Sequence, residues 1–268
     1  MIDPQDPNKY IPPETLIVPC RKLDTLAAFG WLKEGWKDFV RAGKVSLIYG
    51  FFVYLVSLLV ALLAWRLGGY VLLISVLSGF VFIAPLLAFG LYSVSRQLCE
   101  GKTPVLRDTL QAIKRPIGNS MVYTLVLLIV FLLWARAGMM VQVFFPLGGH
   151  PQWGHVLTFL LIGSSVGSIF ASVSFAASVF SLPMLANRDI DVITAVISSV
   201  HAVLRNKTAS LIWAFLICFL TLVGFLTAGF GLIIIIPWLA YATWHGYRAA
   251  LDVTGWPVLP QDGPELTR

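Results

Sequence analysis

The chain alternates long apolar runs with short polar segments, and the length of the apolar runs indicates its class. Uncharged runs cover residues 45–65, 67–95, 117–135 and 156–187. Residues 208–247 contain only His245 as an ionisable side chain and are long enough for two helices. A helix needs about 20 apolar residues to cross a bilayer core about 30 Å thick. A turn at residues 227–231 would divide the last run, because its glycines permit a tight reversal.

This pattern predicts an all-α polytopic membrane protein with six transmembrane helices. The helices are expected at residues 45–65, 69–94, 117–135, 156–183, 208–227 and 230–247. They form a membrane domain at 24–253, between a mobile N-terminal tail at 1–23 and a mobile C-terminal tail at 254–268. Both tails are polar and contain several prolines, which favours extended and mobile chain.

Composition supports lipid as the solvent of this fold. Charged residues make up 12% of the chain and hydrophobic residues 58%, with a mean hydropathy of +0.84. Soluble domains carry about 25% charged residues. The net charge of +6 is therefore interpreted as topology and attraction to anionic lipid, not as a sign of nucleic-acid binding.

Lys and Arg residues gather in alternate connections between the predicted helices. Seventeen of the nineteen lie in residues 1–44, 94–118, 186–207 or 248–268. Only Arg66 and Arg136 fall in the other connections. Because basic residues in short loops stay in the cytoplasm, both termini are predicted to be cytoplasmic.

A sequence repeat predicts three pseudo-repeated helical hairpins. The segment from Pro85 to Arg96 aligns without a gap with the segment from Pro237 to Arg248, and a shorter relative runs from 183 to 188. The cytoplasmic arginines of the repeat are Arg96, Arg188 and Arg248. The prolines Pro85, Pro183 and Pro237 would kink their helices, because each leaves a carbonyl four residues earlier without its donor.

Each hairpin is preceded by a segment with the periodicity of an amphipathic helix. In the first, Phe29, Leu32, Trp36 and Phe39/Val40 share one face, opposite Lys33, Glu34, Lys37, Asp38 and Arg41. The second begins at Thr103-Pro104, and the third runs from about 189 to 204 with Ile193, Val196/Ile197, Val200 and Val203/Leu204 on one face. Such helices either lie in the membrane interface or cap the bundle on the cytoplasmic side.

Several motifs together resemble a known bacterial family. They are Trp36-Lys-Asp-Phe39, Gly90-Leu-Tyr-Ser-Val-Ser-Arg96 with Glu100-Gly101, Leu182-Pro-Met-Leu185 with Asn187-Arg-Asp-Ile-Asp191, and Thr243-Trp-His-Gly-Tyr-Arg248. Their order and spacing resemble the predicted integral membrane proteins of domain-of-unknown-function family 2189, over residues 25–250. The resemblance implies a multi-pass protein of the bacterial inner membrane. It supplies no catalytic residues.

Candidate chemistry is sparse. No Asp, Glu, Lys or Arg lies inside a predicted span, which argues against a proton-driven transporter because such relays need intramembrane charges. His150 and His155 are weak metal candidates, since a functional site usually recruits a third ligand; an exposed loop is the favoured interpretation. His245 could contact a haem or quinone, although an interfacial anchor is favoured. The sequence identifies no cofactor.

Small residues follow one side of the fourth predicted span. They are Gly163, Ser164, Gly167, Ser168, Ala171 and Ser172. Small residues at this spacing let helices approach closely, so the favoured interpretation is a central packing helix. The alternative is a polar track through the bundle.

These features favour a non-enzymatic multi-pass membrane protein. It would act as an accessory, assembly or organising factor, for example for a respiratory or envelope complex, through contacts with lipids and a membrane protein complex or second copies of itself. The apolar loop at 139–147 would suit a partner contact. The alternative is a permease or channel for a small neutral or lipophilic solute.

Overall fold

Helices account for almost all of the ordered elements. The computed structural model describes residues 2–3, 6–10, 17–67, 87–105, 109, 117–144 and 153–258. The helices are α1 (Ala27–Ala42), α2 (Lys44–Leu67), α5 (Ile117–Phe144), α6 (Trp153–Ser178), α7 (Ser181–Asn187), α8 (Val192–Arg205), α9 (Lys207–Leu226) and α10 (Leu232–Ala250). Residues 87–99 are also helical. Near the N-terminus, β1 (Ile2–Asp3) pairs antiparallel with β2 (Asp6–Tyr10).

Within the described residues, four helical segments are long and apolar enough to cross a membrane. They are Lys44–Leu63, Met121–Val141, Val156–Asn187 and Lys207–Leu226. These correspond to the first, third, fourth and fifth predicted spans. The second predicted span lies mostly outside the described residues. Helix α10 covers the sixth, but its second half carries the polar residues Thr243, His245 and Arg248 and lowers its hydropathy.

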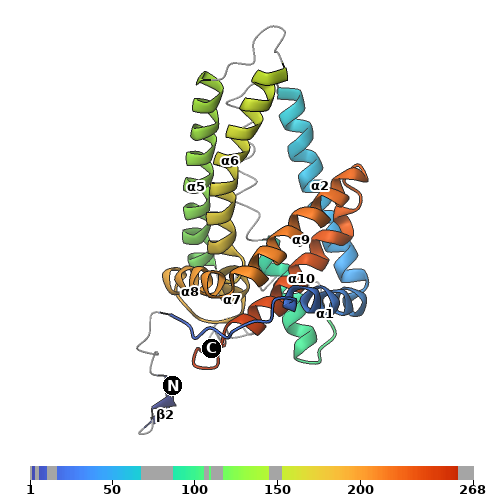
Figure 1. The fold of residues 1–268 in the computed structure, drawn as a ribbon. Helices are drawn as coiled ribbons and strands as arrows, with labels where there is room; N and C mark the ends of the chain where they lie inside the picture. Colours follow the sequence, from blue (N-terminus) through green and yellow to red (C-terminus); the bar gives the residue numbers. More distant parts are fainter. Residues whose placement is uncertain are drawn as a thin grey trace.

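The buried core lies at one end of the molecule, where short helices cross the ends of the long ones (Figure 1). We call this end the basal layer; it comprises α1, α7, α8, residues 87–99 and the basal ends of α9 and α10. Its core includes the fully buried side chains of Trp213, Trp244, Phe180 and Met184. Above it, α5 and α6 stand upright with largely exposed side chains. Tertiary packing is thus concentrated in the basal layer.

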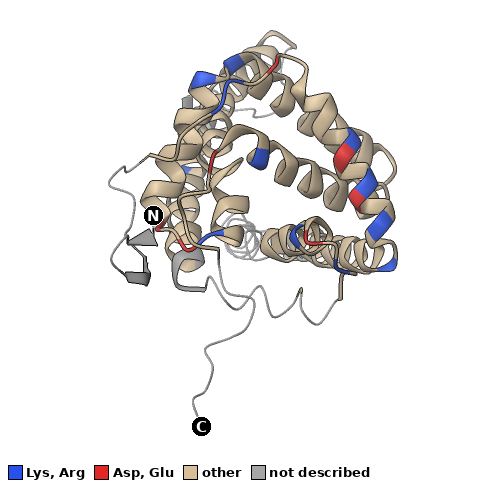
Figure 2. Cartoon of the chain, turned by 90° about the horizontal axis from the view of Figure 1, so that it is seen from below, with Lys and Arg blue, Asp and Glu red and all other residues tan. Residues whose placement is uncertain are grey.

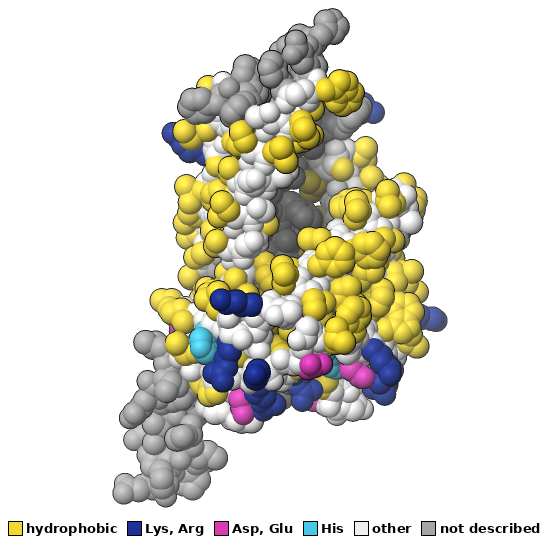
Figure 3. All heavy atoms as spheres, viewed as in Figure 1, with side chains coloured by type: hydrophobic (Ala, Val, Ile, Leu, Met, Phe, Trp, Pro, Cys, Tyr) yellow, Lys and Arg dark blue, Asp and Glu magenta, His cyan; other side chains and the backbone are white. Residues whose placement is uncertain are grey.

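Charged side chains also gather at the basal end, below a broad hydrophobic surface (Figure 3). Seen from below, basic and acidic positions follow one another along α1 (Figure 2). The exposed hydrophobic side chains of α2, α5, α6 and α9 lie above this level. This division into a charged end and an apolar body is the one expected of a protein that sits in a bilayer.

Helix α1 packs most extensively on α10, through a face that includes three small residues, Ala28, Gly35 and Ala42. That face contains Ala28, Trp31, Gly35, Asp38 and Ala42, at alternating spacings of three and four residues. A Cβ atom added to Gly35 would lie 2.5 Å from the backbone nitrogen of Ala242. The backbones of the two helices therefore touch, and only glycine fits at this crossing.

The face of α1 that contacts α10 differs from the predicted apolar face. On the predicted face, Phe29, Trp36 and Val40 remain exposed by 52%, 42% and 61%, whereas Phe39 is buried. Asp38, placed among the charged residues, is buried. The small residues allow the backbones of α1 and α10 to approach closely, and Trp31 and Phe39 are buried beside them. The other large apolar side chains of the predicted face stay fully or partly exposed.

Helix α8 buries its small and polar residues and exposes its large apolar ones. Thr194, Ala195, Ser198, Ser199 and Ala202 are buried. In contrast, Ile193 is 67% exposed, Ile197 40% and Leu204 58%. The carboxylate of Asp191 caps this helix by accepting a hydrogen bond from the amide of Thr194 at 2.9 Å.

Two predicted helix boundaries differ from the structure. The predicted helix at 156–183 is divided into α6 and α7 by a turn at Val179 and Phe180. Pro183 lies in the first turn of α7, where its missing amide hydrogen disrupts no helical bond. Helix α5 continues to Phe144, through residues predicted to be a loop, since no proline interrupts it before 146.

The reversal between α9 and α10 lies at the predicted place, residues 227–231. Ala228 and Gly229 both adopt positive φ angles, of 54° and 85°. The hydroxyl of Thr227 accepts a hydrogen bond from the amide of Gly231 at 2.7 Å. This local bonding closes the turn.

Parts of both predicted tails lie against the basal layer. Residue Cys20 forms an isolated β-bridge with Leu251, and Arg188 forms one with Val258. The amide of Val18 donates to the hydroxyl of Ser198 at 2.9 Å. Residues 17–23 and 254–258 therefore contribute to the fold, and mobility of the remaining tail residues stays a prediction.

Candidate functional site

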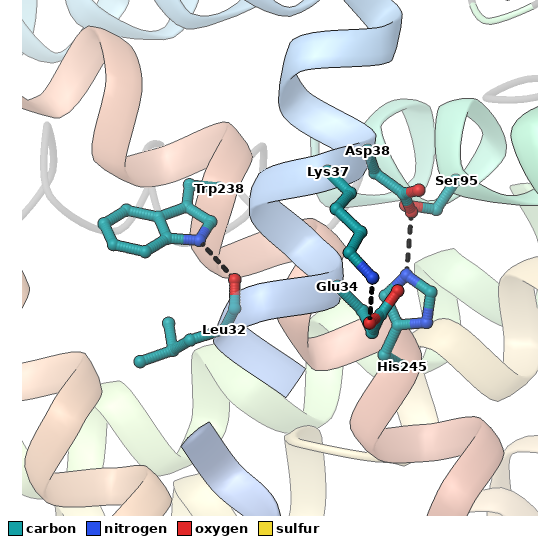
Figure 4. Close-up of polar contacts among 7 residues, drawn as sticks. All are labelled: Leu32, Glu34, Lys37, Asp38, Ser95, Trp238 and His245. Carbon is teal, nitrogen blue, oxygen red and sulfur yellow. Dashed lines mark hydrogen bonds and ion pairs between the residues drawn. The ribbon is translucent and has the colours of Figure 1, made fainter. Parts of the chain in front are cut away.

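The most polar buried contact in the described part of the chain joins three helices in the basal layer. Oδ2 of Asp38 on α1 lies 2.8 Å from Nε2 of His245 on α10. The same oxygen accepts a hydrogen bond of 2.9 Å from Oγ of Ser95, in the helix of residues 87–99 (Figure 4). The side chain of Asp38 is only 6% exposed, and that of His245 is 21% exposed. We call these three residues the Asp38 junction.

The spacing of residues in the sequence indicates that Asp38 lies on a packing face, although Asp38 is charged and its neighbours on that face are mostly small. Residues 28, 31, 35, 38 and 42 alternate three- and four-residue steps, the spacing of a helix seam that packs against a partner helix. Asp38 occupies one position of that seam. A carboxylate inside a packing seam needs a hydrogen-bonding partner, because burying an unpaired charge is costly. His245 and Ser95 meet that need.

The geometry of the junction favours a structural role over catalysis. In nucleophilic catalysis, a histidine lies between the hydroxyl and the carboxylate and accepts the hydroxyl proton. Here the carboxylate lies in the middle, since both Ser95 and His245 bond to the same oxygen of Asp38. The arrangement ties α1 to α10 and to residues 87–99.

Neighbouring polar contacts extend the same connection between helices. The hydroxyls of Ser46 and Tyr241 lie 2.9 Å apart, and Tyr49 donates to the carbonyl of Leu87 at 2.7 Å. On the exposed side of α1, Nζ of Lys37 lies 2.6 Å from Oε1 of Glu34 (Figure 4). This hydrogen bond holds the pKa of the Glu34 carboxyl below its ordinary value.

A second polar junction joins the chain ends to the α8–α9 corner. Oδ1 of Asn206 accepts from the amide of Leu23 at 2.8 Å, and its Nδ2 donates to the carbonyl of Arg21 at 3.1 Å. Arg21 also forms an ion pair of 3.1 Å with Asp252. Hydrogen bonds from Thr254 and Arg21 lower the pKa of the Asp252 carboxyl. Burial raises the pKa of the nearby Cys20 thiol.

The small residues predicted on the fourth span lie along α6, and none is fully buried. A Cβ atom added to Gly163 would meet nothing within 4 Å, and one at Gly167 would meet only Trp134, at 3.7 Å. Ser164 is exposed. The hydroxyl of Ser172 donates to the carbonyl of Ser168 in its own helix at 2.7 Å. Close packing at these residues and a polar track through the bundle both stay predictions.

Two grooves border this side of α6. One, with a volume of about 430 Å³, lies against α5. It is lined by Leu127, Val130, Phe131, Trp134, Gly167, Phe170, Ala171, Ser174 and Ser178. The other, of about 380 Å³, lies between α6 and the α8–α9 corner and is lined partly by Ser168, Ala171 and Ser172. The structure therefore brings three of the predicted small residues to one groove.

The remaining candidates are dispersed. Pro237 lies inside α10, whereas Pro85 and His150 fall outside the described residues. His155 belongs to α6, and its side chain is not described. The described residues contain no group of three or more His, Cys, Asp or Glu side chains that could hold a metal ion.

The repeat arginines have different surroundings. Arg96 is buried, 4.0 Å from Glu100, and Arg188 donates to the carbonyl of Trp256 at 2.7 Å. Arg248 is exposed at the end of α10. Equivalent positions in the repeat thus make different contacts in the basal layer.

The chain has several apolar helices and a charged basal end, and one segment of it matches a known family. Residues 72–187 match the family described as "Predicted integral membrane protein (DUF2189)". Over this segment, the chain is similar to that family. The DUF2189 description states membrane integration, so the predicted resemblance and membrane class are confirmed. No curated protein and no solved structure matches the chain.

Proposed function

We propose that this protein is a non-enzymatic accessory or organising factor that acts through contacts with lipids and with other membrane helices. The observation that carries the proposal is the burial pattern of α8. Full burial of an isoleucine or leucine contributes about 1.5–3 kcal/mol, and the exposed isoleucines and leucine of α8 would forgo part of that stabilisation in water. A surrounding apolar phase removes that cost.

The position of α8 and α1 supports the membrane interface as that phase. Both helices cross the ends of the long helices at the level where charged side chains gather (Figures 1 and 3). Helices that lie in an interface have an apolar face toward the acyl chains and a polar face toward the headgroups. In α1, Phe29, Trp36 and Val40 would supply the first face, and Lys37 and Arg41 the second. We therefore favour interfacial helices over a cytoplasmic cap.

The arrangement of six spans is part of the same proposal. Helix α10 would be the sixth span, entering the bilayer with its apolar first half and ending at the interface with His245 and Arg248. The basal layer would face the cytoplasm of a bacterial cell, in the inner membrane, because the basic residues gather there. Arg66 would lie on the opposite side. Arg136 lies inside the candidate span Met121–Val141, in its last two turns, because α5 continues beyond the predicted span at 117–135.

A non-enzymatic role is supported by the nature of the Asp38 junction. Its carboxylate accepts from two groups that belong to the helix packing and is nearly inaccessible. The exposed helix surfaces, by contrast, are extensive and apolar. Contact surfaces, not a reactive centre, therefore dominate the described part of the molecule.

The test is to identify what accompanies the native protein. Membranes expressing the chain at its native level are solubilised in mild detergent, and the purified material is analysed by mass spectrometry. The proposal expects specific membrane proteins or additional copies of the chain in stoichiometric amounts. A matched variant, Ile197→Lys, places a charge on the exposed face of α8 and should reduce that association. A chain that purifies alone at every expression level would overturn the proposal.

A permease for a small neutral or lipophilic solute is the second candidate, supported by the two adjacent grooves on α6. Flux into proteoliposomes would test it, with Ser168→Leu and Ser172→Leu placed together in the groove. Unchanged flux in this double variant would exclude the proposed route. Ser165→Leu, on the same helix but outside both groove linings, is the control.

A further inference from the structure

The groove between α6 and the α8–α9 corner has apolar walls, one buried hydroxyl and one basic side chain at its basal end. Its walls are mainly apolar, with side chains from three helices. They are Ser168, Ala171, Ser172, Phe175, Val203, Leu204, Lys207, Ser210, Leu211, Ala214, Ile217 and Cys218. Figure 3 shows the surface hollowed between α6 and α9. An occupant of this groove must therefore have a predominantly apolar body.

One hydroxyl in the lining lacks a partner. Ser210 is 97% buried, being 3% exposed, and its Oγ has no hydrogen-bond partner. Leaving a buried hydroxyl without a partner costs free energy, and the great majority of such groups are bonded. The occupant should therefore carry a polar atom at the level of Ser210.

A cation lies at the basal end of the groove. Lys207 is exposed, and within the described part of the chain no carboxylate lies within ion-pair distance of it. Lys207 is also the first residue of a candidate membrane span, which places its ammonium group at the headgroup level. This charge is complementary to an anionic group.

We propose that this groove binds an anionic glycerophospholipid, with its phosphate at Lys207, an ester carbonyl at Ser210 and an acyl chain along Ala214 and Cys218. The order of groups along α9 carries the assignment. Ser210 lies about 4.5 Å deeper than Lys207 along the helix axis, one helical turn into the span. Ala214 and Cys218 continue the same face. A glycerophospholipid presents phosphate, ester and hydrocarbon in this order.

The proposal rests on the proposed contact with lipid and specifies one site for it. It is tested on the purified full-length chain, reconstituted in nanodiscs containing equal parts phosphatidylcholine and phosphatidylglycerol. Native mass spectrometry then measures which lipids stay bound after release. We expect wild type to retain phosphatidylglycerol in preference to phosphatidylcholine. Inorganic phosphate in excess should not displace the lipid, because it lacks the apolar body.

Two variants separate the parts of the site. Lys207→Ala should lower the preference for phosphatidylglycerol about fivefold, the effect of one basic residue near a membrane surface. Lys44→Ala is the matched control, because Lys44 is likewise the first residue of a candidate span. Ala214→Phe should fill the groove and reduce retention of both lipids, whereas Leu222→Phe, outside the lining, should not.

Three results would overturn the proposal. One is retention of neither lipid by wild type. Another is an equal effect of Lys207→Ala and Lys44→Ala, which would indicate general surface attraction. The third is a chain dimer that Ala214→Phe dissociates without loss of lipid, which would assign the groove to a second copy. Because Lys207 is exposed, its variant tests the site without disturbing the fold. Co-purification of partners is a separate measurement, so either proposal can fail alone.

Discussion

Nε2 of His245 lies 2.8 Å from Oδ2 of Asp38, which joins the second half of α10 to α1. These residues are 207 positions apart in the sequence, and their helices form the most extensive packing contact of the described fold. Because Asp38 is nearly inaccessible, its carboxylate depends on this bond and on Ser95. The carboxylate of Asp38 thus connects three helices of the basal layer, although hydrophobic periodicity alone would place this residue on the exposed face of α1.

Replacing His245 by alanine should destabilise the protein. The variant leaves a buried carboxylate with one fewer partner, and hydrogen bonds to charged groups contribute about 1.5–3 kcal/mol. Thermal unfolding in detergent, followed by circular dichroism, measures the change. Lys37→Ala removes the exposed pair with Glu34 and should have little effect. Equal unfolding temperatures for the two variants would contradict the role assigned to the junction.

Replacing Gly35 by alanine should weaken the contact between α1 and α10. The added Cβ would overlap the backbone at Ala242, and overpacking of this kind costs about 1–3 kcal/mol. Gly30 is the control on the same helix, since a Cβ there meets nothing within 4 Å. Gly30→Ala should be neutral or stabilise the helix, by up to about 1 kcal/mol. Limited proteolysis between α1 and α2 would report the loosened packing.

Asp191 should stabilise α8 in a pH-dependent way. Burial raises the pKa of its carboxyl, but hydrogen bonds from the Thr194 hydroxyl and from backbone amides outweigh this and lower the pKa below its ordinary value. The cap therefore contributes stability above the unfolded pKa of about 3.9, and the contribution is lost as pH falls through the lower folded value.

Asp191→Ala should cost about 1 kcal/mol at neutral pH, whereas Asp191→Asn keeps a good capping side chain. Unfolding measured at neutral pH and near pH 3 would check both statements. A wild-type advantage over Asp191→Ala that persists unchanged in acid would show that the charge of the cap is irrelevant.

The orientation has an independent test. A reporter enzyme that works only outside the cytoplasm, inserted after Gly149, should be active, because the connection between α5 and α6 is predicted to lie outside. The same reporter fused at the C-terminus should be inactive. The reverse pattern would place the basal layer outside the cytoplasm and remove the basis for cytoplasmic termini.

The sequence by itself determined the class of the protein and most of its helices. Long uncharged runs predict spans because backbone polar groups in lipid must be bonded within the helix. This local requirement places α2 and α9 within one to two residues of their predicted bounds. The glycines at 229 and 231 likewise identify the turn at 227–231.

Tertiary structure decided which faces of the short helices make contact. The sequence placed Phe29 and Trp36 on the apolar face of α1 and left open what that face contacts. In the structure a different face, with Gly35 and Ala28, packs on α10, because backbone approach depends on small residues. In α8 the serines face the protein and Ile193 faces outward. Periodicity identifies the two faces of an amphipathic helix. In a membrane protein it does not tell which face packs against other helices, because the apolar face can contact lipid instead.

The candidate sites also depended on the three-dimensional arrangement. The sequence identified Ser168, Ala171 and Ser172 as a row on one helix, while Lys207 and Ser210 belong to another helix that meets it only in the fold. Asp38 and His245 are similarly brought together across nearly the whole chain. Local physics fixes which segments are helical and apolar, whereas the identity of a site depends on which distant helices pack against one another.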